Sequence, residues 1–375
     1  MSIPILHIRS GFLVGGPEKL ILSGITGMPG DRYSFILASF VLPQRPNNFL
    51  EYAASLGITT EPIAIGGSFD LQAISKTRDM IMRLAPKLVV AHDYRALVIA
   101  LLAKRGTQIP LLAVAHGWTS QSFKVRVYEY IESKLLRFAD AVVAVSRPRY
   151  AELGRLGIAA NKLYLIENGV TLPAQDQRSR GVEFRRELGL DDQHVIIGSV
   201  GRLSVEKGHR VLIEAAARIR ESCPQARFVL IGDGPLKSEL KRLAAALGVR
   251  DNFLFPGWRS DMAAVYRTLD IFALPSFTEG LPMALLEAMS YSVPSVASSV
   301  GGCGDVIETG ISGFLFRPGD SAALADHLTR LIVDKEFRIK IGAAGYQRIL
   351  KQYSLERYVT QFDELYAGLM EGAGR

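Results

Sequence analysis

The chain has 375 residues, of which 48% are hydrophobic and 22% charged, and its formal net charge is +7. This length exceeds what one hydrophobic core organises, so two domains of about 150 to 200 residues each are expected. No window approaches the roughly 18 to 20 uninterrupted apolar residues that span a bilayer, and the first apolar run contains His7 and Arg9, which is typical of a buried strand rather than a signal peptide. Only Cys223 and Cys303 occur, without zinc-ligand spacing, as expected in a reducing cytosol.

The positive charge lies in the first half of the chain. Residues 1–180 hold 21 lysines and arginines against 13 aspartates and glutamates, whereas the remainder holds 23 against 24. A basic face attracts phosphate-bearing acceptors, anionic lipid headgroups or nucleic acid, and it is equally compatible with a merely solvated surface. Nucleic acid is disfavoured, because no recognised binding module or interleaving of aromatic and basic residues accompanies the charge.

Short runs rich in Val, Ile and Leu alternate with longer amphipathic segments, which predicts parallel strands joined by helices. In the first half, strands are expected at 3–8, 34–41, 87–93, 111–116, 140–146 and 162–167. In the second half, they are expected at 194–200, 227–233, 252–257, 271–276, 294–299 and 313–316. The chain is therefore predicted to form two similar doubly wound α/β domains.

The linker between the domains is placed at residues 171–181, which are polar, contain a proline and show no periodicity. An N-terminal domain over 1–172 and a C-terminal domain over 173–350 are thus expected. Residues 351–375 are predicted to form a helix that packs back across the domain junction. Their apolar residues at helical spacing are Leu355, Tyr358, Phe362 and Leu365.

In open α/β sheets, ligands bind beyond the carboxyl ends of the strands, so the loops after the predicted strands should carry the chemistry. Residues 10–21 follow the first strand and open a helix, with Gly15 and Gly16 at the turn. Glycine lets a backbone approach a ligand, and a helix N-terminus offers N–H groups to an anion. A tight turn that requires glycine is the alternative, and the GxGxxG spacing of dinucleotide sites is absent.

Two further loops present cations and imidazoles. Arg202 and Lys207 are placed in one turn at the start of a helix, where a diphosphate is the natural ligand and solvated surface cations are the alternative. His116 closes one predicted strand, and His92 and Asp93 close its neighbour. A neutral imidazole there could hydrogen-bond a sugar hydroxyl or a phosphate oxygen, although a single histidine is more often a satisfied structural residue.

Residues 275–289, PSFTEGLPMALLEAM, keep two carboxylates in apolar surroundings. Pro282 suits a first helical turn, so the helix is predicted to begin near Leu281. At helical spacing Glu279 and Glu287 would lie up to about 12 Å apart, whereas an acid/base pair on one bond needs roughly 5 to 9.5 Å. The spacing favours two contacts along one elongated polar ligand. A helix-dipole partner and a surface contact are the alternative.

Taken in order, these segments resemble the retaining glycosyltransferases of family 4, whose GT-B fold places two Rossmann-like domains around a nucleotide-sugar cleft. The resemblance covers essentially the whole chain, and the spacing of Glu279 and Glu287 matches the EX7E motif of that family. Each motif alone is weak, but eight in the same order are not expected by chance. The motifs are GGPE at 15–18, HG at 116–117, VSRPRYAEL at 145–153, NGV at 168–170, VGRLSVEKG at 200–208, GDGPL at 232–236, PGW at 256–258 and the segment 275–289.

The resemblance implies a catalytic set. Arg202 and Lys207 match the pair that binds the donor diphosphate, and Gly16 would approach that diphosphate or the acceptor. Glu279 matches the residue that faces the donor sugar, and His116 would lie beside that sugar at the reaction centre. The catalytic residues are therefore expected to be His116, Glu279, Arg202 and Lys207.

The same resemblance implies the remaining donor contacts. Glu287 matches the carboxylate on the ribose hydroxyls, and Trp258 and Arg259 occupy the stretch that contacts the base. Pro282 has no N–H group, so the backbone donors expected on the sugar or the diphosphate are those of Gly280, Leu281, Met283 and Ala284.

The chain departs from the family pattern in two places. Pro17 stands where Ala or Val is commoner, and Cys303, Gly304 and Asp305 stand where the family often has a residue followed by Pro-Glu. No DxD motif occurs, so no metal and no cofactor are expected, and the cations named above would carry the diphosphate charge.

The resemblance implies that a hexosyl unit moves from a nucleotide diphosphate sugar, a UDP-sugar in the first instance, to an acceptor hydroxyl with retention of configuration. Polysaccharide, lipopolysaccharide and glycolipid synthesis all fit a saccharide or lipid-linked acceptor. Epimerisation or hydrolysis of a nucleotide sugar, or its binding without catalysis, are the alternatives. Residues 123–143 mix basic and apolar positions and fit either core packing or an anionic membrane surface. A cytoplasmic protein is therefore expected, either free or peripheral on the membrane.

Overall fold

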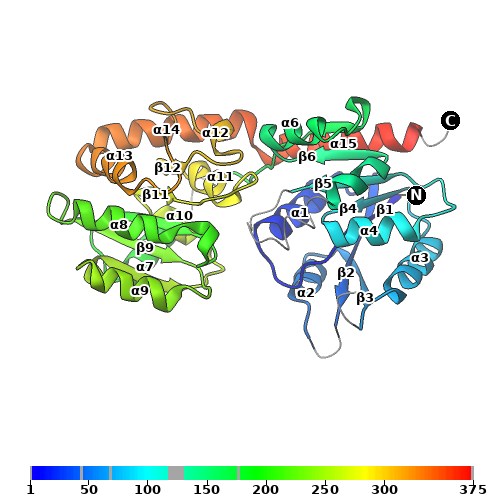
Figure 1. The fold of residues 1–375 in the computed structure, drawn as a ribbon, viewed down its shortest axis with the longest axis horizontal. Coiled ribbons are helices and arrows are strands. Elements are labelled where there is room, and N and C mark those ends of the chain that lie inside the picture. Colours follow the sequence, from blue (N-terminus) through cyan, green and yellow to red (C-terminus); the bar gives the residue numbers. More distant parts are fainter. Residues whose placement is uncertain (1, 43–44, 67–69, 117–130, 175–177, 373–375) are drawn as a thin grey trace. The chain divides into compact units, whose positions relative to one another are not determined.

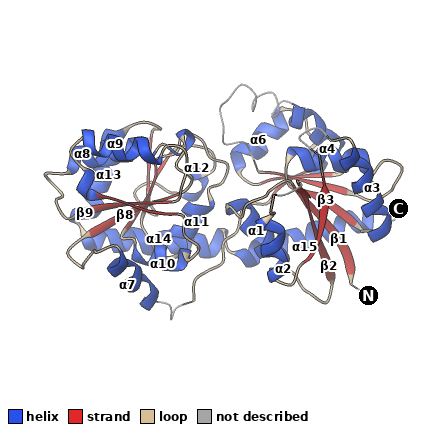
Figure 2. Cartoon of the chain, turned by 90° about the horizontal axis from the view of Figure 1, so that it is seen from below, coloured by secondary structure: helices blue, strands red, loops and turns tan. Residues whose placement is uncertain are grey.

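The computed structural model describes residues 2–42, 45–66, 70–116, 131–174 and 178–372. The chain divides into two compact α/β units (Figure 1). Unit 1 comprises residues 1–169 and 355–375, and unit 2 comprises residues 170–354. Within each unit, helices cover both faces of one parallel sheet (Figure 2). The two doubly wound, Rossmann-like domains predicted from the sequence are thereby confirmed.

Unit 1 is built on a seven-stranded sheet with the order β3-β2-β1-β4-β5-β6-β7. Its strands are β1 (Ile3–Arg9), β2 (Tyr33–Val41), β3 (Thr59–Ala64), β4 (Leu88–Ala91), β5 (Leu111–Ala115), β6 (Ala141–Ala144) and β7 (Leu163–Leu165). Its helices are α1 (Gly16–Gly27), α2 (Asn48–Ser55), α3 (Gln72–Leu84), α4 (Tyr94–Ala103), α6 (Arg147–Arg155) and α15 (Leu355–Gly372). The strand order reverses between β1 and β4, so the loops that follow these two strands diverge at the carboxyl ends of the strands.

Unit 2 has a six-stranded sheet with the order β10-β9-β8-β11-β12-β13. Its strands are β8 (Val195–Val200), β9 (Ala226–Ile231), β10 (Phe253–Gly257), β11 (Ile271–Leu274), β12 (Ser295–Ser298) and β13 (Phe314–Phe316). Its helices are α7 (Arg178–Glu187), α8 (His209–Ile219), α9 (Lys237–Ala246), α10 (Met262–Thr268), α11 (Met283–Ser290), α12 (Cys303–Val306), α13 (Ser321–Val333) and α14 (Lys335–Gln352). Here the order reverses between β8 and β11.

The central strands are apolar throughout because helices bury both of their faces. In β8, the consecutive residues Ile196 and Ile197 point to opposite faces and are both fully buried. Strand β3 is not among the predicted strands. It lies at the edge of its sheet, contains Pro62, and buries only Ile63, so it lacks the apolar run of a central strand.

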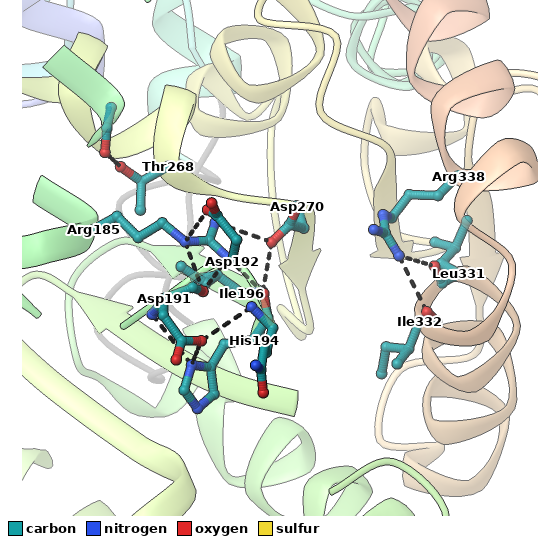
Figure 3. Close-up of polar contacts among 12 residues, drawn as sticks. Arg185, Asp191, Asp192, His194, Ile196, Thr268, Asp270, Leu331, Ile332 and Arg338 are labelled. Carbon is teal, nitrogen blue, oxygen red and sulfur yellow. Dashed lines mark hydrogen bonds and ion pairs between the residues drawn. The ribbon is translucent and has the colours of Figure 1, made fainter. Parts of the chain in front are cut away.

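Residues 171–181, expected to form an irregular linker, instead run into α7, which begins at Arg178. Arg185 of α7 lies 3.5 Å from the Asp270 carboxylate, which accepts a hydrogen bond from Ile196 N (Figure 3). The Arg185 guanidinium also donates to the carbonyls of Asp191 and His194. Helix α7 is therefore fastened to the amino ends of β8 and β11, at the opposite edge from the loops that follow these strands.

Helix α15 covers most of the expected C-terminal helix and packs on α1 of unit 1. Two glycines of α1 make room for it: a Cβ atom at Gly24 would lie 2.9 Å from Tyr358 Cε1, and one at Gly27 would lie 3.0 Å from Val359 Cγ2. Asp363 adds polar contacts, accepting hydrogen bonds from Arg32 and Tyr33. Across the described ranges, no helix combines the length and the apolar character needed to cross a bilayer.

Gly24→Leu should disturb the contact between α1 and α15, because the added side chain overlaps the Tyr358 ring. Overpacking of this kind costs about 1–3 kcal/mol, so a fall of several degrees in melting temperature is expected. Gly368→Leu is the matched control, since nothing lies within 4 Å of a Cβ atom at that position of α15. A Gly24→Leu variant that melts with the wild type would contradict this packing.

Candidate active site

The loop after β8 carries the two cations expected at a diphosphate. Lys207 ends the 3₁₀ helix η3 (Val205–Lys207), directly before α8, whereas the exposed Arg202 lies in the preceding loop. The expectation that both share one helical turn is therefore wrong. Gly208 joins η3 to α8 with φ 62°, a left-handed conformation that glycine adopts without strain. A Cβ atom there would lie 2.1 Å from the carbonyl oxygen of Pro275.

Lys207 and Glu279 form an ion pair between the loops after β8 and β11. Lys207 Nζ lies 2.7 Å from Glu279 Oε1, and Ser276 Oγ donates to the same oxygen at 2.6 Å. The Glu279 side chain is 4% exposed and that of Lys207 21%. A carboxylate this deeply buried requires a charged or hydrogen-bonding partner, and it has both. The residue expected on the diphosphate and the residue expected on the sugar therefore lie in direct contact.

The loop that carries Glu279 ends at α11. This helix begins at Met283, with the extended residue Pro282 at its N-cap, rather than near Leu281 as predicted. Pro282 still removes an N–H group that would have no partner inside the helix. The Leu281 side chain is buried in the core of unit 2, so only the backbone of this residue is placed to meet a ligand.

Glu287 has a different partner from Glu279. Its Oε2 atom accepts a hydrogen bond of 2.6 Å from the hydroxyl of Tyr266, a buried residue of α10. Burial, and then the nearby Glu287 carboxylate, raise the pKa of Tyr266 well above its usual range, so the phenol remains a proton donor. This contact fixes one oxygen of the carboxylate that is expected at the ribose.

Trp258 and Arg259, the pair expected at the base, differ in their surroundings. Arg259 donates to both carboxylate oxygens of Asp261 at 2.8 Å and to Glu187 at 2.6 Å. Its guanidinium also lies 4.2 Å from the ring centroid of Phe184. The hydrogen bonds that Arg259 donates to the carboxylates of Asp261 and Glu187 raise the pKa of Arg259. Arg259 therefore joins α7 to the segment before α10, while Trp258 is 66% exposed.

In unit 1, His116 belongs to a stack of three imidazoles, of which His7 and His92 are buried and His116 is half-buried. Ring centroids are 5.0 Å apart between His7 and His92 and 5.9 Å apart between His92 and His116. His7 Nδ1 and His92 Nε2 share a hydrogen bond of 2.9 Å. Burial lowers the pKa of both His7 and His116 to about 3. His116 is therefore neutral near pH 7, and among the described residues no hydrogen-bond partner faces its buried Nε2 atom.

The N-terminus of α1 carries its own carboxylate. Glu18 Oε2 accepts a hydrogen bond from Gly15 N at 3.0 Å, and Arg9 donates twice to Glu18 Oε1. Gly16, which was expected in the turn before the helix, is the first residue of α1, and an anion that approaches it meets Glu18 as well. The sequence contained the signal for this cap, because Glu18 stands three residues after Gly15.

Several contacts of the site are not among the predicted ones: those of Ser276, Tyr266, Arg9 and His7. Ser276 lies three residues before Glu279 and is the member that sequence spacing can reach. Tyr266 contacts Glu287 from another helix, which only the fold reveals.

Two predictions concern residues at or beyond the end of β5. Gly117 and residues 123–130 of the proposed membrane segment lie outside the described residues. The rest of that segment contains the 3₁₀ helix η1 (Leu136–Phe138) and the buried strand β6. Its end therefore packs in the core of unit 1.

Acid should destabilise unit 1 through its histidine stack. Between pH 6.5 and 3 the unfolded chain binds protons that the folded His7 and His116 exclude, so the free energy of unfolding falls as pH is lowered through this range. Each such group contributes up to about 1.4 kcal/mol per pH unit. His7→Phe should make the melting temperature fall less steeply between pH 6.5 and 4.5. An unchanged slope would contradict the neutral state of His7.

Comparison with known proteins agrees with this architecture. Residues 15–172 match the family model "Glycosyltransferase Family 4", and residues 182–348 match the model "Glycosyl transferases group 1". A D-inositol 3-phosphate glycosyltransferase of Salinispora arenicola is 31% identical over 315 residues, which cover 76% of this chain and 70% of that protein. An Escherichia coli UDP-Gal:alpha-D-GlcNAc-diphosphoundecaprenol alpha-1,3-galactosyltransferase is 23% identical over 98% of both chains.

Solved structures share the fold of the whole chain. The crystal structure of Anabaena HepE in complex with UDP and glucose matches with a TM-score of 0.85 and 23% identity, over 97% of this chain and 99% of that one. Sucrose-phosphate synthase of Thermosynechococcus elongatus matches with a TM-score of 0.82 and 20% identity, over 99% and 100%. The chain therefore belongs to the glycosyltransferases of the family 4 type, with their two-domain GT-B fold.

Proposed function

We propose that this glycosyltransferase moves a hexosyl unit from a nucleotide diphosphate sugar to an acceptor hydroxyl and retains the anomeric configuration. One observation carries the proposal: the buried contact of Lys207 and Ser276 with Glu279, between the loops that follow β8 and β11. A cation and an anion are thereby placed side by side at the edge of the sheet where α/β folds bind nucleotides. The cation suits a diphosphate and the carboxylate suits sugar hydroxyls.

The diphosphate would be held by positive groups of the chain itself. Lys207 is the last residue of η3 and lies two positions before the first residue of the 11-residue helix α8. Arg202 is exposed in the same loop. An arriving diphosphate would compete with Glu279 for the Lys207 ammonium. As the donor bond breaks, charge accumulates on the leaving phosphate, and preorganised cations stabilise it. We therefore propose that transfer is independent of a metal ion.

Retention is proposed to proceed on one face of the sugar. The bond between the anomeric carbon and the phosphate oxygen breaks, and its electron pair stays on the phosphate. The acceptor oxygen then bonds to the same face of the anomeric carbon, and its proton passes to the leaving phosphate. Glu279 Oε1 already accepts from Lys207 and Ser276, which favours a binding role for this carboxylate over a nucleophilic one. His116 is neutral and its Nε2 atom is buried, so this imidazole would either accept a hydrogen bond from a sugar hydroxyl or donate one to it.

A UDP-sugar is the proposed donor. The support comes from relatives: the E. coli transferase is named for UDP-Gal, and the matching HepE structures contain UDP or UDP-glucose. A saccharide or lipid-linked acceptor is proposed because the name of the same E. coli protein gives a diphosphoundecaprenol-linked sugar as its acceptor. The basic first half of the chain suits such an acceptor, and we propose that the protein works in the cytoplasm at an anionic membrane surface.

Lys207→Ala should lower acceptor-dependent release of UDP by about 100-fold or more, because it removes the cation that stabilises the negative charge on the leaving diphosphate. Lys335→Ala is the matched control: this exposed lysine begins α14, outside the loops after β8 and β11, and its replacement should leave turnover unchanged. Release of UDP would be followed by coupled assay across a panel of UDP-sugars and acceptors.

Two results would overturn the proposal. Near-normal turnover in Lys207→Ala would remove Lys207 from the site. Consumption of the nucleotide sugar at the same rate without any acceptor would identify a hydrolase or an epimerase instead of a transferase.

A further inference from the structure

The segment that carries Glu279, residues 275–282, is called the sugar loop here and is held on its first side by the loop after β8. Phe277 N donates to the carbonyl of Glu206 at 2.8 Å. Gly208 faces the carbonyl oxygen of Pro275 so closely that a Cβ atom would lie 2.1 Å away. The beginning of the sugar loop is therefore fixed to the residues that position Lys207.

The other side of the sugar loop is held by the chain that leaves β12. Gly302 N donates to the carbonyl of Gly280 at 2.6 Å. A Cβ atom built at Gly301 would lie 2.0 Å from the carbonyl oxygen of Glu279 and 2.7 Å from that of Gly280. Gly301 also has φ 50°, a conformation that side chains disfavour. Two independent constraints therefore require glycine at this position.

The support behind Gly301 is part of the core of unit 2. Helix α12 follows it directly, and its residues Cys303 and Val306 are fully buried. The carbonyl of Asp305 accepts hydrogen bonds from Arg348 Nη2 at 2.7 Å and from the Tyr353 hydroxyl at 2.9 Å. Residues of and directly after α14 thus anchor α12, and α12 fixes the chain that contacts the sugar loop.

We infer that Gly301 is a positioning residue for sugar transfer. Its missing side chain lets the backbone after β12 approach the carbonyl of Glu279, and this contact sets where the Glu279 carboxylate meets the donor sugar. Gly301 itself does not touch the donor. The inference rests on the proposed role of Glu279 at the sugar. It concerns residues 300–302, which precede residues 303–305, where the chain departs from the family pattern.

Gly301→Ala tests the inference, with Gly304→Ala as the matched control two residues into α12. The added methyl group at residue 301 must displace the sugar loop, whereas nothing lies within 4 Å of a Cβ atom at residue 304. Misplacement of a catalytic group by about 1 Å can cost up to about 100-fold in rate. Gly301→Ala should therefore lower kcat by about 10-fold or more, and Gly304→Ala should leave kcat within about 2-fold of the wild type.

Binding measurements separate positioning from a general loss of structure. By calorimetry, the Kd of Gly301→Ala for UDP should stay within about 3-fold of the wild-type value, while the extra affinity for UDP-glucose over UDP should fall. Wild-type kcat in Gly301→Ala, or parallel losses of UDP binding and turnover, would overturn the inference.

A second variant tests the same contact if Gly301→Ala does not fold, and the activity of the wild type tests the proposed function separately. If Gly301→Ala does not fold, Tyr353→Phe takes its place, because it removes one hydrogen bond to the Asp305 carbonyl. A fall in kcat with unchanged UDP binding would support the inference, and wild-type kcat would overturn it. A wild-type protein that shows no acceptor-dependent release of UDP would instead overturn the proposed function, independently of Gly301.

Discussion

The ion pair between Lys207 and Glu279 is the interaction on which the proposed chemistry depends. The two residues are 72 positions apart in sequence, yet they meet because β8 and β11 are neighbours in the sheet. Burial of a glutamate side chain to 4% exposure is costly without compensation by a cation or a hydrogen-bond donor. Lys207 and Ser276 supply it, so the unliganded site already holds the charges in place. An arriving diphosphate would then meet a cation that is already in position, and preorganised charges are the condition for effective electrostatic catalysis.

Both units use the same topological device with different chemistry. In each sheet the strand order reverses beside a central strand, and polar side chains gather beyond the carboxyl ends of the strands on either side. Unit 2 places a charged pair there. Unit 1 places the neutral imidazoles of His92 and His116 there, beside His7 within β1 and the ion pair of Arg9 and Glu18. A neutral imidazole can both donate and accept hydrogen bonds, as recognition of a sugar hydroxyl requires.

The fold was largely predictable because buried parallel strands are continuous apolar runs. Edge strand β3 was the exception, since Glu61 and Pro62 interrupt its pattern and the edge position tolerates both. The start of α11 was predicted too early because Pro282 fits an N-cap as well as a first turn. Helix α7 was missed because its residues Arg178 to Glu187 are mostly polar. Its support comes from Arg185, which contacts residues at the amino ends of β8 and β11.

The candidate site was predictable only as a set of residue types. Spacing placed Glu279 and Glu287 on one segment, but it could not pair Glu279 with Lys207 or Glu287 with Tyr266, because those contacts arise from strand order and helix packing. The sequence alone gives no specific role to the glycines at 208 and 301. Only the fold reveals that each faces a carbonyl of the sugar loop.

A crystal structure with UDP tests the central claim most directly. A diphosphate oxygen should accept a hydrogen bond from the Lys207 ammonium at about 3 Å. Glu279 should keep its hydrogen bond from Ser276, and its other carboxylate oxygen should face the position of the sugar. UDP bound away from Lys207, with the ion pair between Lys207 and Glu279 intact, would contradict this claim.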